Sequence, residues 1–311
     1  MRFRCFFLAV VAAAWTVTVV LGMHVAGENT VKVLSFNIRY DTPADGKNRW
    51  SLRREMVRDL IKQVGADFVG IQEATPGQLA YLTEQLPEYG VLTRTREANH
   101  RKGEAVPLLF RRSRWKLDTK EQGTFWLSES PEVPGSRSWK TACPRIVTWG
   151  RFVEKESGRA VYVYNTHLDH RSAQARREGA RLLAKRIAER RHPDPVLLTG
   201  DFNAGESSEP IRCLKGELDG SPVTLRDTFR AVHAEVEDAG TFHGFTGKTS
   251  AAKIDYVFVS LGVRVRSAAI LHNNIDGRYP SDHCPVEAEV VLPTNRPEPR
   301  KAEGGAAAKA L

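Results

Sequence analysis

Side chains that can bind metal ions, move protons or hold phosphate occur at the ends of the apolar runs of this sequence. In chain order they are Asn37, Glu73, Asn165 with His167, Asp201 with Asn203, Asp255, and Asp282 with His283. A sheet fixes the ends of its strands, while side chains at those ends project toward a rim or a cleft. Packing alone does not explain this recurrence, so we expect these residues to converge on one catalytic site.

Glu73 follows the apolar run 68–72, where a carboxylate is costly to bury without a partner. By itself it could equally well cap the helix that follows. Because Asp201, Asp255 and Asp282 can converge with it, we favour an oxygen-lined site for a hard divalent cation. Mg²⁺ typically takes one or two protein carboxylates and keeps several waters, and Mn²⁺ is an expected substitute.

Two short segments place groups that can transfer protons near this carboxylate. In T-G-D-F-N, Asp201 can act as a general base toward water, and Asn203 can hold that water or a phosphate oxygen. In S-D-H, His283 can stabilise charge on phosphate oxygens or exchange a proton, and Asp255 can favour its cationic form. Turn-forming roles are the alternative for both segments. Zinc is less well supported, because the histidines lack close paired-ligand spacing.

The pattern between these residues predicts strands that alternate with helices. Apolar or alternating runs predict strands at 31–38, 68–72, 161–168, 195–199, 254–260 and 285–292, and the region 89–152 is rich in strands. Helical spacing of apolar residues predicts helices at 51–64, 76–86 and 172–191. Together they predict an α/β fold in which a two-layered sheet core is covered by helices.

Length and composition indicate one large domain. The 311 residues are 41% hydrophobic, and no internal repeat or linker interrupts residues 28–294. The net charge is +9, but residues 1–27 and 295–311 each carry two of these charges, which leaves about +5 for the body. This charge suits a phosphorylated substrate without identifying a nuclease.

The two ends of the chain differ from the body. Arg2 and Arg4 precede an apolar run at 5–22 and small residues up to Gly27, an order that predicts a signal peptide at 1–27 and export to the periplasm or beyond. A retained N-terminal membrane anchor is the alternative. Residues 295–311 are rich in Pro, Ala, Gly and charge and are expected to be disordered.

Three cysteines follow the predicted signal peptide, namely Cys143, Cys213 and Cys284. An odd number excludes a fully paired disulfide framework, and their spacing is not that of a metal site. We expect three buried, structural thiols.

Six segments resemble, in this order, the endonuclease/exonuclease/phosphatase superfamily: SFNIR (35–39), GIQE (70–73), NTHLD (165–169), GDFN (200–203), IDYVF (254–258) and PSDHCPV (280–286). They span nearly the whole of residues 28–294. The resemblance implies a four-layered α/β sandwich of the DNase I type, in which two mixed β-sheets pack face to face with helices outside.

The resemblance also implies a role for each residue around the metal. Glu73 would be the principal Mg²⁺ ligand, with Asn37 and Asp282 near the metal or its waters. Asp201 would position or deprotonate the attacking water, and Asn203 would hold a phosphate oxygen.

Two histidines would act on the phosphate itself. His283, with Asp255 as its partner, would contact the scissile phosphate. His167 would be a second phosphate ligand or the acid for the leaving group. Asp201 and His283 both stay open as the general base.

Further segments resemble a bacterial, often exported branch of the superfamily: TFWLSESPEVPGSRSWKTACPRIVTWGRF (124–152), NTHLDHRS (165–172) and TFHGFTG (241–247). In that branch Arg145 and His243 would line the phosphate pocket, with His170 as a further candidate. A surface position is the alternative for Arg145, and a structural role in a turn is the alternative for His243 and His170. An arginine can grip phosphate bidentately. Cys143 departs from the branch pattern, so we assign it no catalytic role.

The predicted function is Mg²⁺-dependent hydrolysis of a phosphoester by in-line attack of water. A small phosphorylated molecule or a lipid headgroup is slightly favoured as substrate, because a nuclease should carry a long basic groove. A nuclease acting on DNA or RNA is the alternative. A non-catalytic module that binds phospholipid or protein is less favoured, since the catalytic residue types are all present. We expect a monomer with no obligate protein partner.

Overall fold

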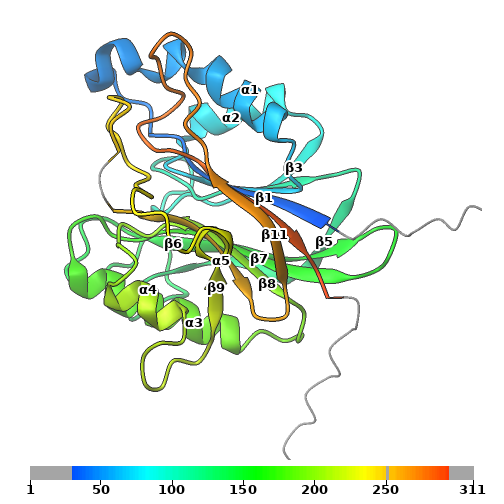
Figure 1. Cartoon of the computed structure of the whole chain (residues 1–311). Helices are drawn as coiled ribbons and strands as arrows, with labels where there is room; N and C mark the ends of the chain where they lie inside the picture. Colours follow the sequence, from blue (N-terminus) through cyan, green and yellow to red (C-terminus); the bar gives the residue numbers. More distant parts are fainter. Residues whose placement is uncertain (1–29, 250–251, 294–311) are drawn as a thin grey trace, which may run out of the picture.

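Two β-sheets packed face to face form the centre of the molecule, and helices cover the outer face of each sheet (Figure 1). The computed structural model describes residues 30–249 and 252–293. The predicted signal peptide and the predicted disordered tail lie outside the described residues. Within the described part, none of the helices is long and apolar enough to cross a membrane. The predicted four-layered α/β sandwich is confirmed.

The first sheet contains both ends of the described chain. Its strand order is β11 (Arg264–Ile270), β12 (Val286–Val291), β1 (Thr30–Asn37), β2 (Phe68–Gln72), β4 (Leu108–Arg111) and β3 (Tyr89–Leu92). β1 and β2 run parallel, and the other neighbouring pairs are antiparallel. The parallel pair brings the carboxyl ends of β1 and β2 to the same edge of the sheet.

The second sheet is also mixed. Its strand order is β5 (Trp115–Trp126), β6 (Ile146–Glu154), β7 (Ala160–His167), β8 (Val196–Asp201), β10 (Asp255–Ser260) and β9 (Leu225–Asp227). β7 and β8 are parallel, with His167 opposite Asp201, and Asp201 is opposite Asp255 in the antiparallel pair β8–β10. The strand register alone therefore places these three residues in one row.

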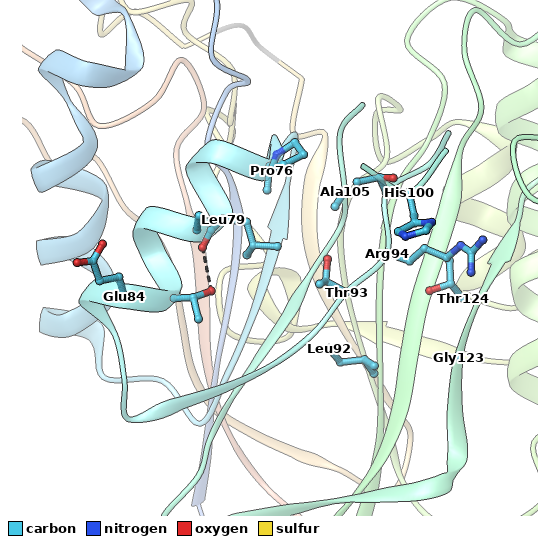
Figure 2. A pocket seen from close by; sticks show the side chains of 14 residues that line it. Pro76, Leu79, Glu84, Leu92, Thr93, Arg94, His100, Ala105, Gly123 and Thr124 are labelled. Carbon is cyan, nitrogen blue, oxygen red and sulfur yellow. Dashed lines mark hydrogen bonds between the residues drawn. The ribbon is translucent and has the colours of Figure 1, made fainter. Parts of the chain in front are cut away.

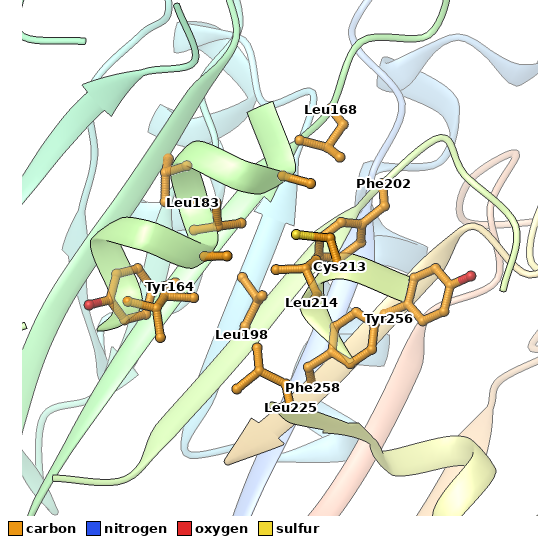
Figure 3. Close-up of a cluster of buried hydrophobic side chains, with 14 of the residues drawn as sticks. Tyr164, Leu168, Leu183, Leu198, Phe202, Cys213, Leu214, Leu225, Tyr256 and Phe258 are labelled. Carbon is orange, nitrogen blue, oxygen red and sulfur yellow. The ribbon is translucent and has the colours of Figure 1, made fainter. Parts of the chain in front are cut away.

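The helices bury apolar faces on the outsides of the two sheets. They are α1 (Arg54–Val64), α2 (Pro76–Gln85), α3 (Ala173–Ala188), α4 (Glu209–Leu214) and α5 (Thr228–Val232), with 3-10 turns η1 (Pro43–Asn48) and η2 (Trp50–Leu52) before α1. Leu60 and Ile61 of α1 pack in a cluster with Ile71 of the first sheet. On the second sheet, Leu183 of α3 packs in a cluster with Leu198 (Figure 3).

Apolar residues of both sheets fill the space between them, and near the site the sheets approach closely. A Cβ on Gly70 would lie 1.9 Å from Thr199 Oγ1, so only glycine fits there. Asn165 Nδ2 donates to the carbonyl of Ile71 at 2.7 Å, and Gln72 Nε2 donates to Asn165 Oδ1 at 2.7 Å. Asn165 is fully buried and joins the two sheets, so its place at a strand end reflects packing.

The predicted strands and helices form, most with small shifts at their ends. The helix predicted at 51–64 is the largest difference, because residues 50–52 form η2 and α1 begins only at Arg54. The intervening Arg53 is almost completely buried, and its guanidinium donates to the carbonyls of Asn48, Ile38, Arg39 and Pro280. These contacts hold a turn where the apolar spacing predicted a continuous helix.

Four short or edge elements were not predicted: β9, β11, α4 and α5. β11 is an edge strand whose Arg264 and Ser267 are exposed, so it lacks the apolar alternation of an inner strand. α4 and α5 have six and five residues, too few to show a helical period.

Candidate active site

A cavity of about 530 Å³ lies beside the carboxyl ends of β2, β7 and β8. The predicted site residues on its wall are Glu73, Arg145, His167, His170, Asp201, Asn203, Asp282 and His283. Arg39, Tyr40, Arg96, Glu104, Cys143, Phe242 and Ile254 complete the lining. Both sheets contribute, so strand ends far apart in the sequence meet around one cavity, which we call the catalytic cavity.

Asn37 joins the two sheets beneath this cavity. Its Nδ2 donates to Glu73 Oε1 at 3.0 Å and to Asp201 Oδ2 at 2.9 Å, while its Oδ1 accepts from Arg39 N at 2.9 Å. The side chain is buried and does not reach the cavity wall. Asn37 therefore orients two carboxylates from below, and its oxygen is already engaged.

Glu73 turns out of β2 in a left-handed backbone conformation, with φ 64°. This conformation is uncommon for a residue with a side chain and costs roughly 1–3 kcal/mol. Hydrogen bonds hold both carboxylate oxygens, since Tyr40 N donates to Oε2 at 3.0 Å and Asn37 donates to Oε1. Strain and hydrogen bonds together fix the carboxylate at the cavity wall.

The loop after β8 alternates between core and cavity. Phe202 is fully buried, and its ring meets Tyr256 and Phe258 edge-on at 5.4 Å (Figure 3). Asn203 N donates to Asp201 Oδ1 at 2.9 Å, and Asn203 Nδ2 lies 2.9 Å from His167 Nε2. Anchoring Phe202 in the core therefore presents its two neighbours to the cavity.

His283 lies between two aspartates of the second sheet. Its Nδ1 is 2.9 Å from Asp255 Oδ2, and its Nε2 is 3.8 Å from Asp201 Oδ2. Burial alone would lower the pKa of His283, but Asp255 and Asp201 outweigh it and hold the pKa well above its usual value. His283 is therefore an imidazolium at neutral pH and donates from Nδ1 to Asp255.

Asp201 and His167 differ in the protons they carry. Burial and the charge of Asp255 raise the pKa of Asp201 to about 7. Burial, followed by the guanidinium of Arg145, holds the pKa of His167 well below its usual value. Asp201 can thus gain or lose a proton near neutral pH, whereas His167 is neutral and accepts from Asn203.

Asp282 is held by the segment that carries it. Ser281 Oγ donates to the carbonyl of Asn37 at 2.6 Å, and the buried Arg53 donates to the carbonyl of Pro280 at 2.9 Å. Burial raises the pKa of Asp282, and the charge of Glu73 adds to that effect. The carboxylates of Glu73 and Asp282 therefore lie close enough for each to disfavour the charge of the other.

Two arginines, Arg96 and Arg145, also line the catalytic cavity. Arg145 is 5% exposed, its Nη2 is 2.9 Å from His170 Nδ1, and its Nε is 3.7 Å from Asp169 Oδ2. Burial and Arg145 lower the pKa of His170, so the imidazole accepts from the guanidinium. Asp169 is itself engaged, since it accepts from Ala142 N at 2.9 Å and Ser172 N at 2.6 Å.

Arg96 and Glu104 belong to the lining of this cavity and were missed from the sequence. Arg96 Nη1 donates to Glu104 Oε2 at 2.7 Å, and their backbones pair through Arg96 N and Glu104 O at 2.8 Å. They lie on two segments joined by the bridge Thr95–Ala105, outside any predicted strand end. The sequence could not indicate this pair, because an arginine and a glutamate eight residues apart, with a glycine between them, match no motif.

The donor set suits a hard divalent cation. Glu73, His167 and Asp201 present ligand atoms within 4.8 Å of one another, as do Asp201, Asp255 and His283. Burial raises the pKa values of Asp201 and Asp282, and a bound cation would favour their charged forms. Cys143, Asp169 and His170 form a third such group, but the hydrogen bonds of Asp169 leave it poorly suited to a metal.

Two predicted placements need correction. His243 does not line the cavity; its N donates to the carbonyl of Asp282 at 2.9 Å, its ring packs on Tyr279, and burial with the charge of His283 lowers its pKa to about 4. It supports the segment of Asp282 from behind. Cys143 is only half-buried and forms part of the cavity wall, so the expectation of three buried thiols was wrong there.

A second and larger cavity, of about 980 Å³, lies beside α2 (Figure 2). We call it the α2 groove. Pro76 and Leu79 of α2 form one side, and Arg94 and His100 face them across it. The backbone pair Ala74–Ala105 separates the groove from Glu73 and Glu104, which face the catalytic cavity.

Comparisons with known proteins agree with this geometry. The sequence model of the Endonuclease/Exonuclease/phosphatase family matches residues 34–283. An endonuclease/exonuclease/phosphatase from Bacteroides vulgatus is 32% identical, with a TM-score of 0.75 over 85% of this chain and 99% of that chain. A mannosyl-6-phosphatase of Bacteroides thetaiotaomicron is 29% identical, with a TM-score of 0.75 over 84% and 99%. An uncharacterized protein of Acanthamoeba polyphaga mimivirus is 24% identical over 84% of this chain and 94% of its own length.

Proposed function

Because the chain belongs to the endonuclease/exonuclease/phosphatase family of phosphoester hydrolases, we propose that it hydrolyses a phosphoester of a small molecule with Mg²⁺ held at Glu73. One observation carries this proposal. Glu73, Asp201, His283 and Arg145 line a single cavity. Glu73 can bind a cation, Asp201 can act as a base, and the cationic His283 and Arg145 can bind the oxygens of one phosphate. Mn²⁺ is expected to replace Mg²⁺.

The residues divide the work of in-line hydrolysis. Bound Mg²⁺ would supply Lewis-acid neutralisation of charge on the phosphate. Asp201, with a pKa of about 7, is suited to orient the attacking water and accept its proton. Asn203 and the His283 imidazolium stabilise the non-bridging oxygens, where charge develops. His283 remains the alternative partner for proton exchange.

His167 has a narrower role than the family resemblance implies. Its pKa is held well below the usual value by burial and Arg145, so at neutral pH it has no extra proton for a leaving group. It accepts from Asn203 and lies 3.3 Å from Asp201 Oδ2. We therefore assign His167 to holding Asn203 in place beside the phosphate.

Three observations favour a small substrate. The similar mannosyl-6-phosphatase is named for a phosphorylated sugar, and the catalytic cavity has the volume of a site for a small molecule. The modest charge of the body points the same way. The predicted signal peptide supports action outside the cytoplasm, which cell fractionation would check. We also expect a monomer, which light scattering would check.

A substrate screen tests the proposal. Purified protein is assayed with Mg²⁺, Mn²⁺ or EDTA against p-nitrophenyl phosphate, bis(p-nitrophenyl) phosphate, sugar phosphates, single-stranded DNA, RNA and sphingomyelin. Metal-dependent turnover of the small esters is expected. Preferred cleavage of the nucleic acids would replace the proposal with a nuclease. No turnover of any substrate by folded wild-type protein would favour a binding module.

A further inference from the structure

Arg96 is a partly buried cation on the catalytic cavity that the proposed mechanism does not use. It is held in place from three directions: Nη1 donates to Glu104, the backbone pairs with Glu104, and its carbonyl accepts from Trp126 Nε1 at 2.6 Å. The side chain is 17% exposed. Such fixation loses little further entropy when the guanidinium binds a ligand.

Arg96 and Arg145 lie on the same part of the wall. Both line the catalytic cavity and its narrow continuation, which Glu73, Glu104 and His167 also line. The Nε atoms of both arginines are buried and have no hydrogen-bond partner among the described residues. The carboxylates of Glu97 and Asp169 lie 3.7 Å from these two atoms, too far for a hydrogen bond, so each guanidinium keeps donor capacity that a bound anion would satisfy.

The cavity places guanidiniums beside carboxylates, and this arrangement bears on the substrate. A cation held by carboxylates can bind the non-bridging oxygens of any phosphoester, so it does not distinguish monoesters from diesters. A phosphomonoester has a third non-bridging oxygen and a second negative charge, whereas a diester has another organic group at that position. Two guanidiniums beside the carboxylates fit the additional charged oxygen and disfavour an uncharged group.

We infer that Arg96, positioned by Glu104 and acting beside Arg145, recognises the second negative charge of a phosphomonoester and makes the enzyme a monoesterase. The inference rests on the proposed function, since it assumes phosphoester hydrolysis in this cavity. It assigns a specificity role to a residue pair that sequence reasoning did not find.

The test compares two substrates in matched arginine variants. Wild type, Arg96→Ala, Arg96→Lys and Arg94→Ala are assayed with Mg²⁺ at pH 8 on p-nitrophenyl phosphate, a dianionic monoester, and bis(p-nitrophenyl) phosphate, a monoanionic diester. Arg94 is the matched control, because it lies two residues away and faces the α2 groove instead. Arg96→Ala is expected to lower the monoester-to-diester ratio of kcat/KM by roughly 10- to 100-fold, the effect of losing one hydrogen bond between charged groups.

The variants also separate recognition from folding. Arg96→Lys keeps the charge and should recover part of the ratio, and Arg94→Ala should leave the ratio as in wild type. Equal losses on both substrates, an unchanged ratio in Arg96→Ala, or the same loss in Arg94→Ala would each overturn the inference. If Arg96→Ala does not fold, Glu104→Gln tests the same point, because it frees Arg96 and should lower the ratio by a smaller factor.

Binding gives a readout that does not need turnover. Isothermal titration with inorganic phosphate and with dimethyl phosphate should show a preference for inorganic phosphate that Arg96→Ala reduces. Equal binding of the two anions by wild type would overturn the inference. Wild-type protein that hydrolyses neither ester contradicts the proposed function itself. Active protein whose monoester-to-diester ratio does not change in Arg96→Ala contradicts only the role of Arg96.

Discussion

The catalytic cavity and the α2 groove lie on opposite sides of the backbone pair Ala74–Ala105, yet they differ in volume and in the burial of their charged residues. The groove is larger, about 980 Å³ against about 530 Å³. Glu84 and His100, which line the groove, are exposed. In the catalytic cavity, Asp201 and His283 are buried and lie within 4 Å of each other.

This contrast shows that buried, interacting charge identifies the site better than volume does. None of the groups of potential metal ligands in the described residues includes a residue of the groove. Burial is costly for each carboxylate or imidazole alone, and the groups persist together because they compensate one another. The groove has no such arrangement, so its residues should be tolerant of substitution.

The largest expected effect comes from exchanging one carboxylate on each side. Glu73→Gln should lower kcat/KM with Mg²⁺ by roughly 10³-fold or more, because it removes the principal cation ligand while keeping the shape. Glu84→Gln, the same change in the groove, should stay within about twofold. Steady-state kinetics on the best small ester measures both. Comparable losses in the two variants would remove the distinction between the cavities.

A smaller effect is expected when the partner of His283 loses its charge. Asp255→Asn should lower kcat by roughly 10²-fold. Since Asp255 holds the pKa of His283 above its usual value, the variant should lose the imidazolium at lower pH. The alkaline limb of the pH–rate profile should therefore move to lower pH. A profile that keeps its alkaline limb would show that the charge of His283 does not matter for the reaction.

Cation affinity should depend on pH in the catalytic cavity. Asp201 lies close to Glu73 and has a pKa raised to about 7, so below that pH the loss of its negative charge should weaken binding of the cation at Glu73. Mg²⁺ affinity should rise by about tenfold between pH 6 and pH 8, with release of protons. Calorimetry in buffers of different ionisation enthalpy measures both quantities. Constant affinity over this range would exclude Asp201 from the cation site.

The smallest effect is expected from filling the groove. Ala80 is exposed on the α2 side of the groove, and Ala80→Trp should occupy part of its volume without touching the core. Hydrolysis of a small ester should change by less than about twofold. Loss of activity with an unchanged unfolding temperature would mean that the groove takes part in binding even small substrates.

The strand-end residues could be predicted because a sheet imposes their position. Glu73, Asp201 and Asp255 follow or begin apolar runs, and strand register then decides which of them meet. The sequence could not indicate that Asn165 turns inward between the sheets, because its neighbours in the other sheet are about ninety residues away.

Residues positioned by loops escaped prediction for a different reason. Arg96 and Glu104 line the cavity from two short segments that pair with each other. The sequence of these segments shows no regular spacing of apolar residues. Arg53 fell within a run with helical spacing, yet its guanidinium collects carbonyls from three separate segments. Such contacts depend on tertiary placement, so no local pattern can report them.

We expect the hydrogen bond from Asn37 to Asp201 to form late in folding, and activity to appear with it. It joins residues 164 positions apart, and the contact from Arg53 to Pro280 spans 227 positions. Contacts that close such long loops form late, after the local hairpins and helices of each sheet. During refolding, tryptophan fluorescence from the second sheet, whose strands follow one another along the chain, should recover before hydrolysis does, because the first sheet closes only when β1 pairs with β12.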